Sequence, residues 1–314
     1  MQCYLCGHAK SRVVSEKLRY GEPRKVLQCE RCGLVVLEPQ TESPQEYYRE
    51  DYRKVYTPIV GEQVTSRQIF DMYLPFQQRR VEELRPFLNP TMRVLEVGCS
   101  AGHFLYAIKG FVKECVGIEF NENDARFVNQ ELGIKVHTSP IEETGLPEQH
   151  FDLIAVLQVL EHMEDPLGFL GTVSRYLKRG GYLCVEVPNV DEALLTVYDV
   201  PGYRTFYYKP PHIFYYSPKT LRMLLEKAGF RGEMKSVQRY NFVNHMNWVL
   251  TGKPQKRADV AMSTPVLVGA DAASRAVKDE LNQWFQRLDE EYKAILNKHQ
   301  LGESVLFLGK NYGS

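Results

Sequence analysis

The residues best suited to chemistry lie around two apolar runs in the first half of the chain. The first run contains Glu96 and leads into a turn with Gly98 and Gly102, and the second ends at Glu119, 21 residues after Gly98. Glycine lets the main chain approach a ligand closely, and the N–H groups that open a helix can receive an anionic group. A carboxylate at the tip of the next strand can accept both hydroxyls of a ribose. This arrangement predicts a site for a nucleotide-containing cofactor.

The turn does not match the dinucleotide fingerprint G-x-G-x-x-G, because Ser100 and His103 stand where glycines are required. It resembles the glycine-rich motif E/D-x-G-x-G-x-G of class I S-adenosylmethionine (SAM)-dependent methyltransferases, with Ser100 in place of the middle glycine. An ordinary glycine turn between a strand and a helix is the alternative. The resemblance implies a SAM site formed by Glu96, Gly98, Cys99, Ser100, Gly102, Glu119, Phe120, Leu157 and Gln158.

A second pattern, near the N-terminus, consists of two Cys-x-x-Cys-Gly pairs separated by 22 residues. The cysteines are Cys3, Cys6, Cys29 and Cys32. Four thiolates with this spacing can surround one tetrahedral zinc ion, and four protein ligands leave no open position for catalysis. Disulfides or a redox dithiol are the alternatives. A redox dithiol needs only one pair, and we expect no signal peptide and a reducing cytoplasm, so the pattern favours a structural zinc ribbon over residues 1–40.

Strands and helices alternate along the middle of the chain. Residues 151–157 form a nearly continuous apolar run typical of a buried parallel strand, Pro166 fits the first turn of a helix, and residues 182–187 form a further strand. The alternation predicts a doubly wound parallel α/β sheet. Residues 160–166 (LEHMEDP) resemble the fourth methyltransferase motif, and residues 211–221 resemble the segment after the fifth strand in the small-molecule branch of that superfamily.

The resemblance implies a seven-stranded, Rossmann-like class I methyltransferase sheet with an antiparallel last strand. We expect its core at residues 90–250, a strand at 233–242 and the last strand at 304–309, within residues 302–314. A helical lid at 41–89 precedes the core. An insertion at 251–301 contains a loop at 251–264 and an amphipathic helix at 272–301. We expect the apolar face of this helix to cover the core or a second copy of the chain, so a homodimer is possible.

Composition restricts the class of partner. The 314-residue chain has 39 Lys and Arg residues against 39 Asp and Glu residues, with 44% hydrophobic residues. This balance argues against a nucleic-acid partner, although it does not exclude a local basic patch. No apolar run is long enough to cross a bilayer, so we expect a cytoplasmic enzyme with a small-molecule substrate and no membrane partner.

Two histidines are the candidate catalytic groups. His162 follows the predicted strand at 151–157, at the edge where ligands bind in such sheets, and His212 lies in a loop rich in aromatic residues. An imidazole can accept the proton of a hydroxyl near neutral pH. The alternative for His162 is that it only orients its own loop. The predicted substrate contacts are Tyr207, Tyr208, Tyr215 and, in the lid, Tyr52.

The ribbon joined to this core resembles bacterial methyltransferases that act on nucleotide-linked sugars, surface-glycan precursors and natural-product precursors. Sugar C-methyltransferases of that group commonly have Glu before the loop histidine, whereas Pro211 precedes His212 here, so a hydroxyl or an amine is the expected acceptor. Three alternatives remain open: an rRNA methyltransferase that uses the ribbon to contact RNA, a methyltransferase for a quinone precursor, and a non-catalytic SAM-binding scaffold.

Overall fold

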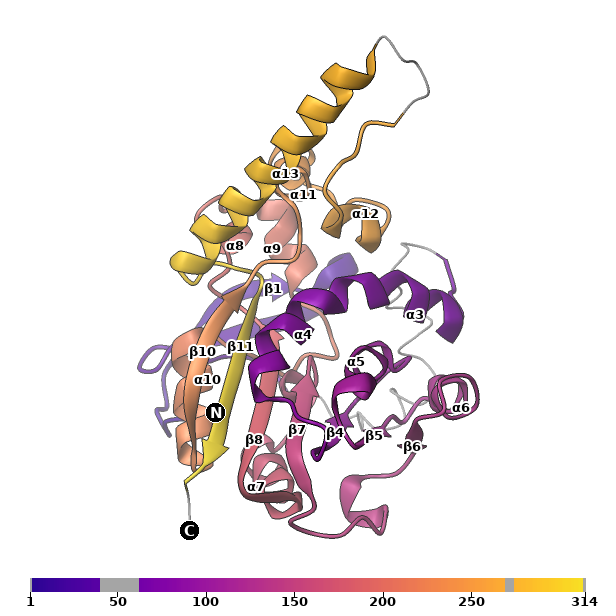
Figure 1. The fold of residues 1–314 in the computed structure, drawn as a ribbon. Coiled ribbons are helices and arrows are strands. Elements are labelled where there is room, and N and C mark those ends of the chain that lie inside the picture. Colours follow the sequence, from indigo (N-terminus) through magenta and orange to yellow (C-terminus); the bar gives the residue numbers. More distant parts are fainter. Residues whose placement is uncertain (1, 40–61, 269–273, 313–314) are drawn as a thin grey trace.

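A central sheet of seven strands organises the chain in a computed structural model that describes residues 2–39, 62–268 and 274–312 (Figure 1). Its strand order is β10-β11-β8-β7-β4-β5-β6. Only β11 runs antiparallel to its neighbours, β8 and β10. This topology confirms the predicted class I methyltransferase fold. The strands are β4 (Arg93–Val97), β5 (Glu114–Ile118), β6 (Lys135–His137), β7 (Phe151–Leu157), β8 (Leu177–Pro188), β10 (Phe230–Val237) and β11 (Ser304–Asn311).

Helices cover both faces of the sheet. Side chains alternate along each strand, so Ile154 and Val156 pack with one set of helices while Leu153 and Ala155 pack with the other. The first set is α7 (Pro166–Tyr176) and α10 (Pro218–Lys227). The second set is α3 (Ser66–Tyr73), α4 (Gln78–Leu84), α5 (His103–Ile108) and α6 (Glu122–Glu131). The apolar runs that predicted buried parallel strands are therefore covered on both sides.

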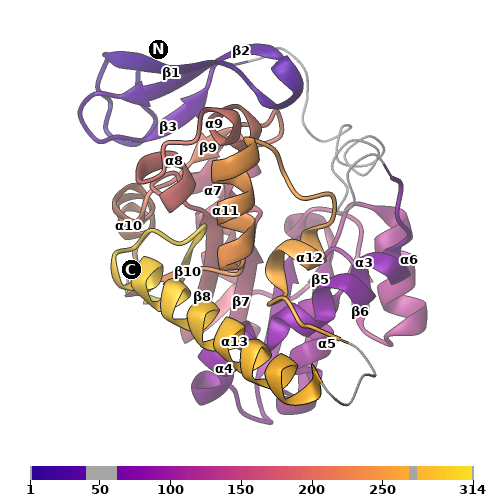
Figure 2. The same cartoon turned by 90° about the horizontal axis from the view of Figure 1, so that it is seen from above.

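The N-terminal ribbon, which we define as residues 2–39, forms a second sheet that includes a strand from the core. Its own strands are β1 (Ser11–Lys17), β2 (Pro23–Cys29) and β3 (Val35–Leu37), with the 3-10 turn η1 (Arg19–Gly21) between the first two. The fourth strand is β9 (Phe214–Tyr215), which pairs antiparallel with β3. Figure 2 shows the ribbon lying over α9 (Pro201–Tyr207) and β9. The ribbon therefore packs directly on the segment that carries His212.

From β10 onward, the segments differ in part from the sequence prediction. The strand expected at 233–242 ends at Val237, because the Asn241 side chain accepts the N–H of Asn244 and caps a new helix, α11 (Phe242–Thr251). The segment expected as a loop at 251–264 contains α12 (Ala258–Met262). The helix expected at 272–301 is α13 (Arg275–Lys298), and a short helix, α8 (Ala193–Thr196), precedes α9.

The sequence predicts no membrane partner and leaves a homodimer possible, and the described helices bear on both points. No helix among residues 2–39, 62–268 and 274–312 is both long enough and apolar enough to span a membrane. On α13, the apolar side chains of Val277, Leu281 and Trp284 are spaced along one face and are exposed. A homodimer remains a prediction.

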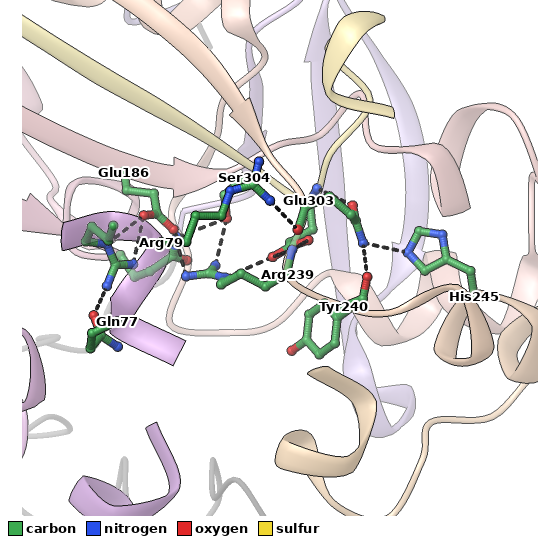
Figure 3. A network of polar contacts seen from close by, with 11 residues as sticks. Gln77, Arg79, Glu186, Arg239, Tyr240, His245, Glu303 and Ser304 are labelled. Atoms are coloured by element: carbon green, nitrogen blue, oxygen red, sulfur yellow. Dashed lines mark hydrogen bonds and ion pairs between the residues drawn. The ribbon is translucent and has the colours of Figure 1, made fainter. Parts of the chain in front are cut away.

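A buried network of charges connects α4 to the carboxyl edge of the sheet (Figure 3). Glu186 on β8 has a side chain only 2% exposed; one carboxylate oxygen accepts from Arg80 on α4 at 2.8 Å, and the other lies 2.8 Å from Arg239, just after β10. Arg239 also donates to Glu303, just before β11, at 2.9 Å. Two arginines thus neutralise two buried carboxylates, as buried charges require.

The network predicts an acid-dependent loss of stability. Burial raises the pKa of Glu186, but Arg239 and Arg80 outweigh it and lower the pKa from 4.5 to about 2. The stabilisation is therefore present above about pH 4.5 and disappears as the pH falls toward 2. In urea unfolding, we expect the difference between wild type and Glu186→Gln to shrink across this range by on the order of 3 kcal/mol.

The control for this experiment is Glu131→Gln, which removes an exposed carboxylate paired with Arg67 at 2.7 Å. Exposed pairs contribute little, so this variant should follow the wild type at every pH. A Glu186→Gln difference that stays constant from pH 7 to pH 2 would contradict the assignment.

Candidate active site

The turn after β4 requires unusual backbone geometry. Gly98, Ser100 and Gly102 all have positive φ, at 75°, 50° and 74°. A Cβ at Gly98 would lie 2.4 Å from a methyl carbon of Val159, so only glycine fits there. Ser100 adopts the left-handed conformation while its N–H donates to the Glu119 carboxylate at 2.8 Å. This bond explains how serine can replace the middle glycine of the motif.

Two carboxylates flank this turn. Glu119, at the end of β5, accepts the N–H of Ser100 with one oxygen and the N–H of Asn121 with the other, both at 2.8 Å. Glu96 on β4 is 3% exposed, and its Oε2 has no hydrogen-bond partner among the described residues. Burial raises the pKa of Glu96 well above its usual value, although Arg80 opposes the shift. A narrow turn with an oriented carboxylate beside it fits the ribose hydroxyls and cationic amino group of SAM.

The other predicted cofactor residues contribute in different ways. The Cys99 side chain is buried against Gly117, so only its backbone can face a ligand. Gln158 has φ of 59°, and its side chain lies 3.3 Å from Glu186 and 3.3 Å from Ser304. Leu157 ends β7 and is buried, and Phe120 is half-buried. Gln158 thus links the end of β7 to Glu186 in the charge network.

The two candidate histidines meet although 50 residues separate them. His162 lies in the 3-10 turn η6 (Leu160–His162) directly after β7, and His212 lies in the loop before β9. Their rings contact edge to face, with centroids 4.6 Å apart. The Nδ1 atom of His162 lies 2.7 Å from the carbonyl oxygen of Pro211, which fixes the orientation of that ring.

Glu161, which was not among the predicted site residues, completes this cluster. Its side chain is 1% exposed, and its Oε1 lies 3.9 Å from the Nε2 atoms of both His162 and His212. Neither carboxylate oxygen receives a hydrogen bond from another described residue. Nδ1 of His212 also has no hydrogen-bond partner in the described part of the chain. Unsatisfied buried polar atoms of this kind are costly, and they commonly mark functional sites.

Lys209 is the second residue that sequence reasoning missed. Burial, and then the nearby charge of Arg19, lowers its pKa to about 7, whereas burial raises the pKa of Glu161 to about 8. Burial and Lys209 also lower the pKa of His162 to about 3 and that of His212 well below its usual value. Both imidazoles are therefore neutral at physiological pH, the form that accepts a proton.

A signal for both missed residues was present in the sequence. Glu161 stands directly before His162 in the quoted motif, and Lys209 is the only charged residue in an aromatic and proline-rich stretch at 205–218. Glu161, His162 and His212 also have the residue types of a metal site. Because Lys209 is close enough to lower the pKa values of Glu161, His162 and His212, it supplies positive charge there, and we assign no metal to this cluster.

The predicted substrate tyrosines are mostly in the interior. Tyr207, Tyr208 and Tyr215 are 8%, 2% and 1% exposed. The Tyr215 hydroxyl bonds both the N–H and the carbonyl of Lys209, at 2.8 and 3.0 Å, so it supports the loop. The Tyr207 hydroxyl has no hydrogen-bond partner among the described residues. Tyr52 lies outside the described residues. Substrate contact by these residues remains a prediction.

The four N-terminal cysteines converge. The sulfur atoms of Cys3 and Cys32 lie 3.5 Å apart, those of Cys6 and Cys29 lie 3.6 Å apart, and all four fall within 4.8 Å of one another. None of the four is in a disulfide. Ligands at about 2.3 Å from a tetrahedral zinc ion would be about 3.8 Å apart, so the cluster fits zinc. Gly7 and Gly33 follow the pairs with φ of 69° and 87°, as the tight turns require.

Comparison with known proteins gives the family. The sequence profile of a family described as a methyltransferase domain matches residues 70–234, more than half of the chain. The chain is 30% identical over 197 residues to a tRNA U34 carboxymethyltransferase of Colwellia psychrerythraea, a match that covers 59% of each protein. It is 27% identical over 168 residues to a ubiquinone biosynthesis O-methyltransferase of a Ruegeria species, covering 50% of this chain and 66% of that protein.

A solved SAM-dependent methyltransferase from Archaeoglobus fulgidus aligns with a TM-score of 0.48 at 20% identity, covering 76% of this chain and 94% of that one. The chain spans 59% of the length of the Colwellia relative.

Because the family profile matches more than half of its residues, the chain belongs to the methyltransferase domain family.

Proposed function

We propose that this protein is a SAM-dependent methyltransferase that modifies a hydroxyl, or an amine, of a small molecule. The observation that carries the proposal is the placement of two sites on neighbouring strands. The turn at Gly98–Gly102 follows β4, and the Glu161–His162–His212 cluster lies after β7, which pairs with β4. Ligands of such sheets bind at the carboxyl ends of the strands, so a donor and an acceptor would meet there.

When bound, SAM supplies an electrophilic methyl group. The residues of this chain would bind and orient the acceptor and remove its proton. Nδ1 of His212 is the proposed proton-accepting atom, because it has no partner among the described residues while Nε2 faces Glu161 3.9 Å away. In its ionised form, which the nearby charge of Lys209 favours, Glu161 would stabilise the resulting imidazolium, as the carboxylate does in a catalytic triad. His162, oriented by the Pro211 carbonyl, would pack against the base and hold it in place.

The proposed acceptor is a nucleotide-linked sugar, a surface-glycan precursor or a natural-product precursor. The joined ribbon and core support it, as do the equal numbers of basic and acidic residues, which give no general attraction to a polyanion. The match to a tRNA-modifying enzyme favours an RNA acceptor as the second candidate, and the match to a ubiquinone enzyme favours a quinone precursor. A non-catalytic scaffold would bind SAM without converting it.

Methyl transfer from labelled SAM into a cell extract tests these alternatives directly. The extract is separated into small-molecule, lipid and RNA fractions after the reaction. We expect label in the small-molecule fraction, where the compound can be identified. Label confined to RNA or to lipid would overturn the proposed acceptor class and support the second or third candidate. SAM binding without conversion in any fraction would contradict the enzymatic function.

The His212→Ala variant tests the proposed base. We expect SAM affinity to remain, because His212 is not part of the cofactor turn, and kcat to fall by roughly 10²- to 10⁴-fold, the usual contribution of a positioned base. The measurements are calorimetric SAM binding and steady-state rates with the identified acceptor. The matched control is His150→Ala, which removes a partly exposed histidine near Glu114. Unchanged turnover in His212→Ala would remove His212 as the base.

We also propose that the four-cysteine cluster holds one structural zinc ion. Metal analysis of the purified chain should give one zinc per molecule, and Cys6→Ser should lower that content sharply because it removes one of four ligands. Cys115→Ser is the control, since Cys115 lies on β5, outside the four-cysteine cluster, with its sulfur 3.8 Å from the Leu105 carbonyl. Equal zinc content in both variants, or no zinc in the wild type, would refute the assignment.

A further inference from the structure

We propose that the N-terminal ribbon is the positioning device for the His212 loop, and that Arg19 is its principal positioning residue. The inference rests on the proposed role of His212 and gives the ribbon a part in the reaction. It does not require the ribbon to touch the acceptor. Three sets of contacts carry it.

The first set is made by the ribbon backbone. The N–H of Arg19 donates to the Tyr208 carbonyl at 2.7 Å, and the N–H of Leu37 donates to the Ile213 carbonyl at 2.9 Å. Directly after that, β9 joins the ribbon sheet, with Phe214 opposite Val36 and Tyr215 opposite Val35. The segment on both sides of His212 is therefore hydrogen-bonded to the ribbon.

The second set is made by ribbon side chains. Arg19 donates through Nε to the Phe206 carbonyl at 2.6 Å, and its guanidinium lies 3.6 Å from the centre of the Phe206 ring. Arg24, on β2, lies 3.5 Å from the Pro210 carbonyl. A planar guanidinium that both donates and stacks restrains a segment in two directions. Arg19 thus contacts this segment through its backbone N–H, through Nε and through the face of its guanidinium.

The third set shows why the loop needs these donors. Pro210 and Pro211 have no N–H groups, so they contribute none of the donors with which a loop can order itself. On its inner side, the Ile213 N–H donates to the Glu161 carbonyl at 2.9 Å, and the Pro211 carbonyl lies 2.7 Å from Nδ1 of His162. The loop is therefore attached to η6 on its inner side and to the ribbon on its outer side, where Figure 2 shows the ribbon over β9.

A metal ion bound by the four cysteines would determine how firmly the ribbon holds the His212 loop. Cys29 is the last residue of β2 and Cys32 lies just before β3, so a metal ion bound there would fix the strand whose free edge receives β9. A ribbon of this size has too small a core to keep its shape without the ion. Removal of the metal should therefore release the His212 loop before it affects the cofactor turn.

Hydrogen–deuterium exchange of the peptide covering residues 206–216, with Arg19→Ala in the full chain, tests the inference. We expect exchange in this peptide to rise by roughly tenfold or more and kcat to fall, while SAM affinity and exchange at residues 94–120 stay as in the wild type. Arg19→Lys should restore part of both effects, because lysine keeps one donor and the charge. The matched control is Arg12→Ala, because the Arg12 side chain donates two hydrogen bonds to Gln28 within the ribbon itself.

Each outcome has a defined meaning. Equal exchange at residues 206–216 in Arg19→Ala and Arg12→Ala would overturn the inference. If Arg19→Ala does not fold, exchange of the same peptide is measured in the wild type with a zinc chelator and again after zinc is restored. Exchange rates at residues 206–216 that do not change when zinc is removed would also overturn the inference. If the loop loosens as expected but the wild type methylates nothing, the proposed function fails while the ribbon's positioning role stands.

Discussion

Glu186 is buried at the carboxyl edge of the sheet, and the cations that neutralise it come from two different parts of the chain. Arg80 belongs to the helices that precede the core, whereas Arg239 follows β10 and also binds Glu303 before β11. A buried carboxylate without such partners would be strongly destabilising, so these contacts must form together. They hold α4 against the sheet, and they fix the chain where it leaves β10 and where it enters β11. Gln158, hydrogen-bonded to Glu186, extends the same restraint to the end of β7.

The same edge holds a second group of buried polar atoms that is left incomplete. Glu161 and His212 are almost fully enclosed, yet Glu161 Oε1, Glu161 Oε2 and His212 Nδ1 have no hydrogen-bond partners among the described residues. Around Glu186, by contrast, the buried carboxylate oxygens have hydrogen-bond partners, so the two clusters differ in role. One cluster uses its charges to fix the architecture, and the other keeps unused hydrogen-bonding capacity, which we propose serves a reacting molecule. Burial raises the pKa of Glu161 in the second cluster, and the nearby charge of Lys209 opposes that rise.

Local pattern predicted much of the fold. The apolar runs at β4, β5 and β7, the glycines at 98 and 102, and the spacing of four cysteines each carry their signal within a few residues. The features that sequence reasoning missed depend on contacts between distant segments. No local signal brings Glu161 beside His212, and nothing in the two residues of β9 shows that they pair with β3. The end of β10 at Val237 was missed although the capping residue Asn241 was visible, because strand and helix propensities compete there.

The pairing of β3 with β9 also has a consequence during biosynthesis. Val36 leaves the ribosome 178 residues before Phe214, its partner. At usual translation speeds this leaves the nascent ribbon with an open strand edge for roughly ten seconds or longer. An exposed edge of this kind is a template for wrong pairing with other chains. Early binding of a metal ion would let the ribbon fold around its cysteines during this interval. In a cell starved of the metal, the N-terminal segment would stay unfolded for the same time.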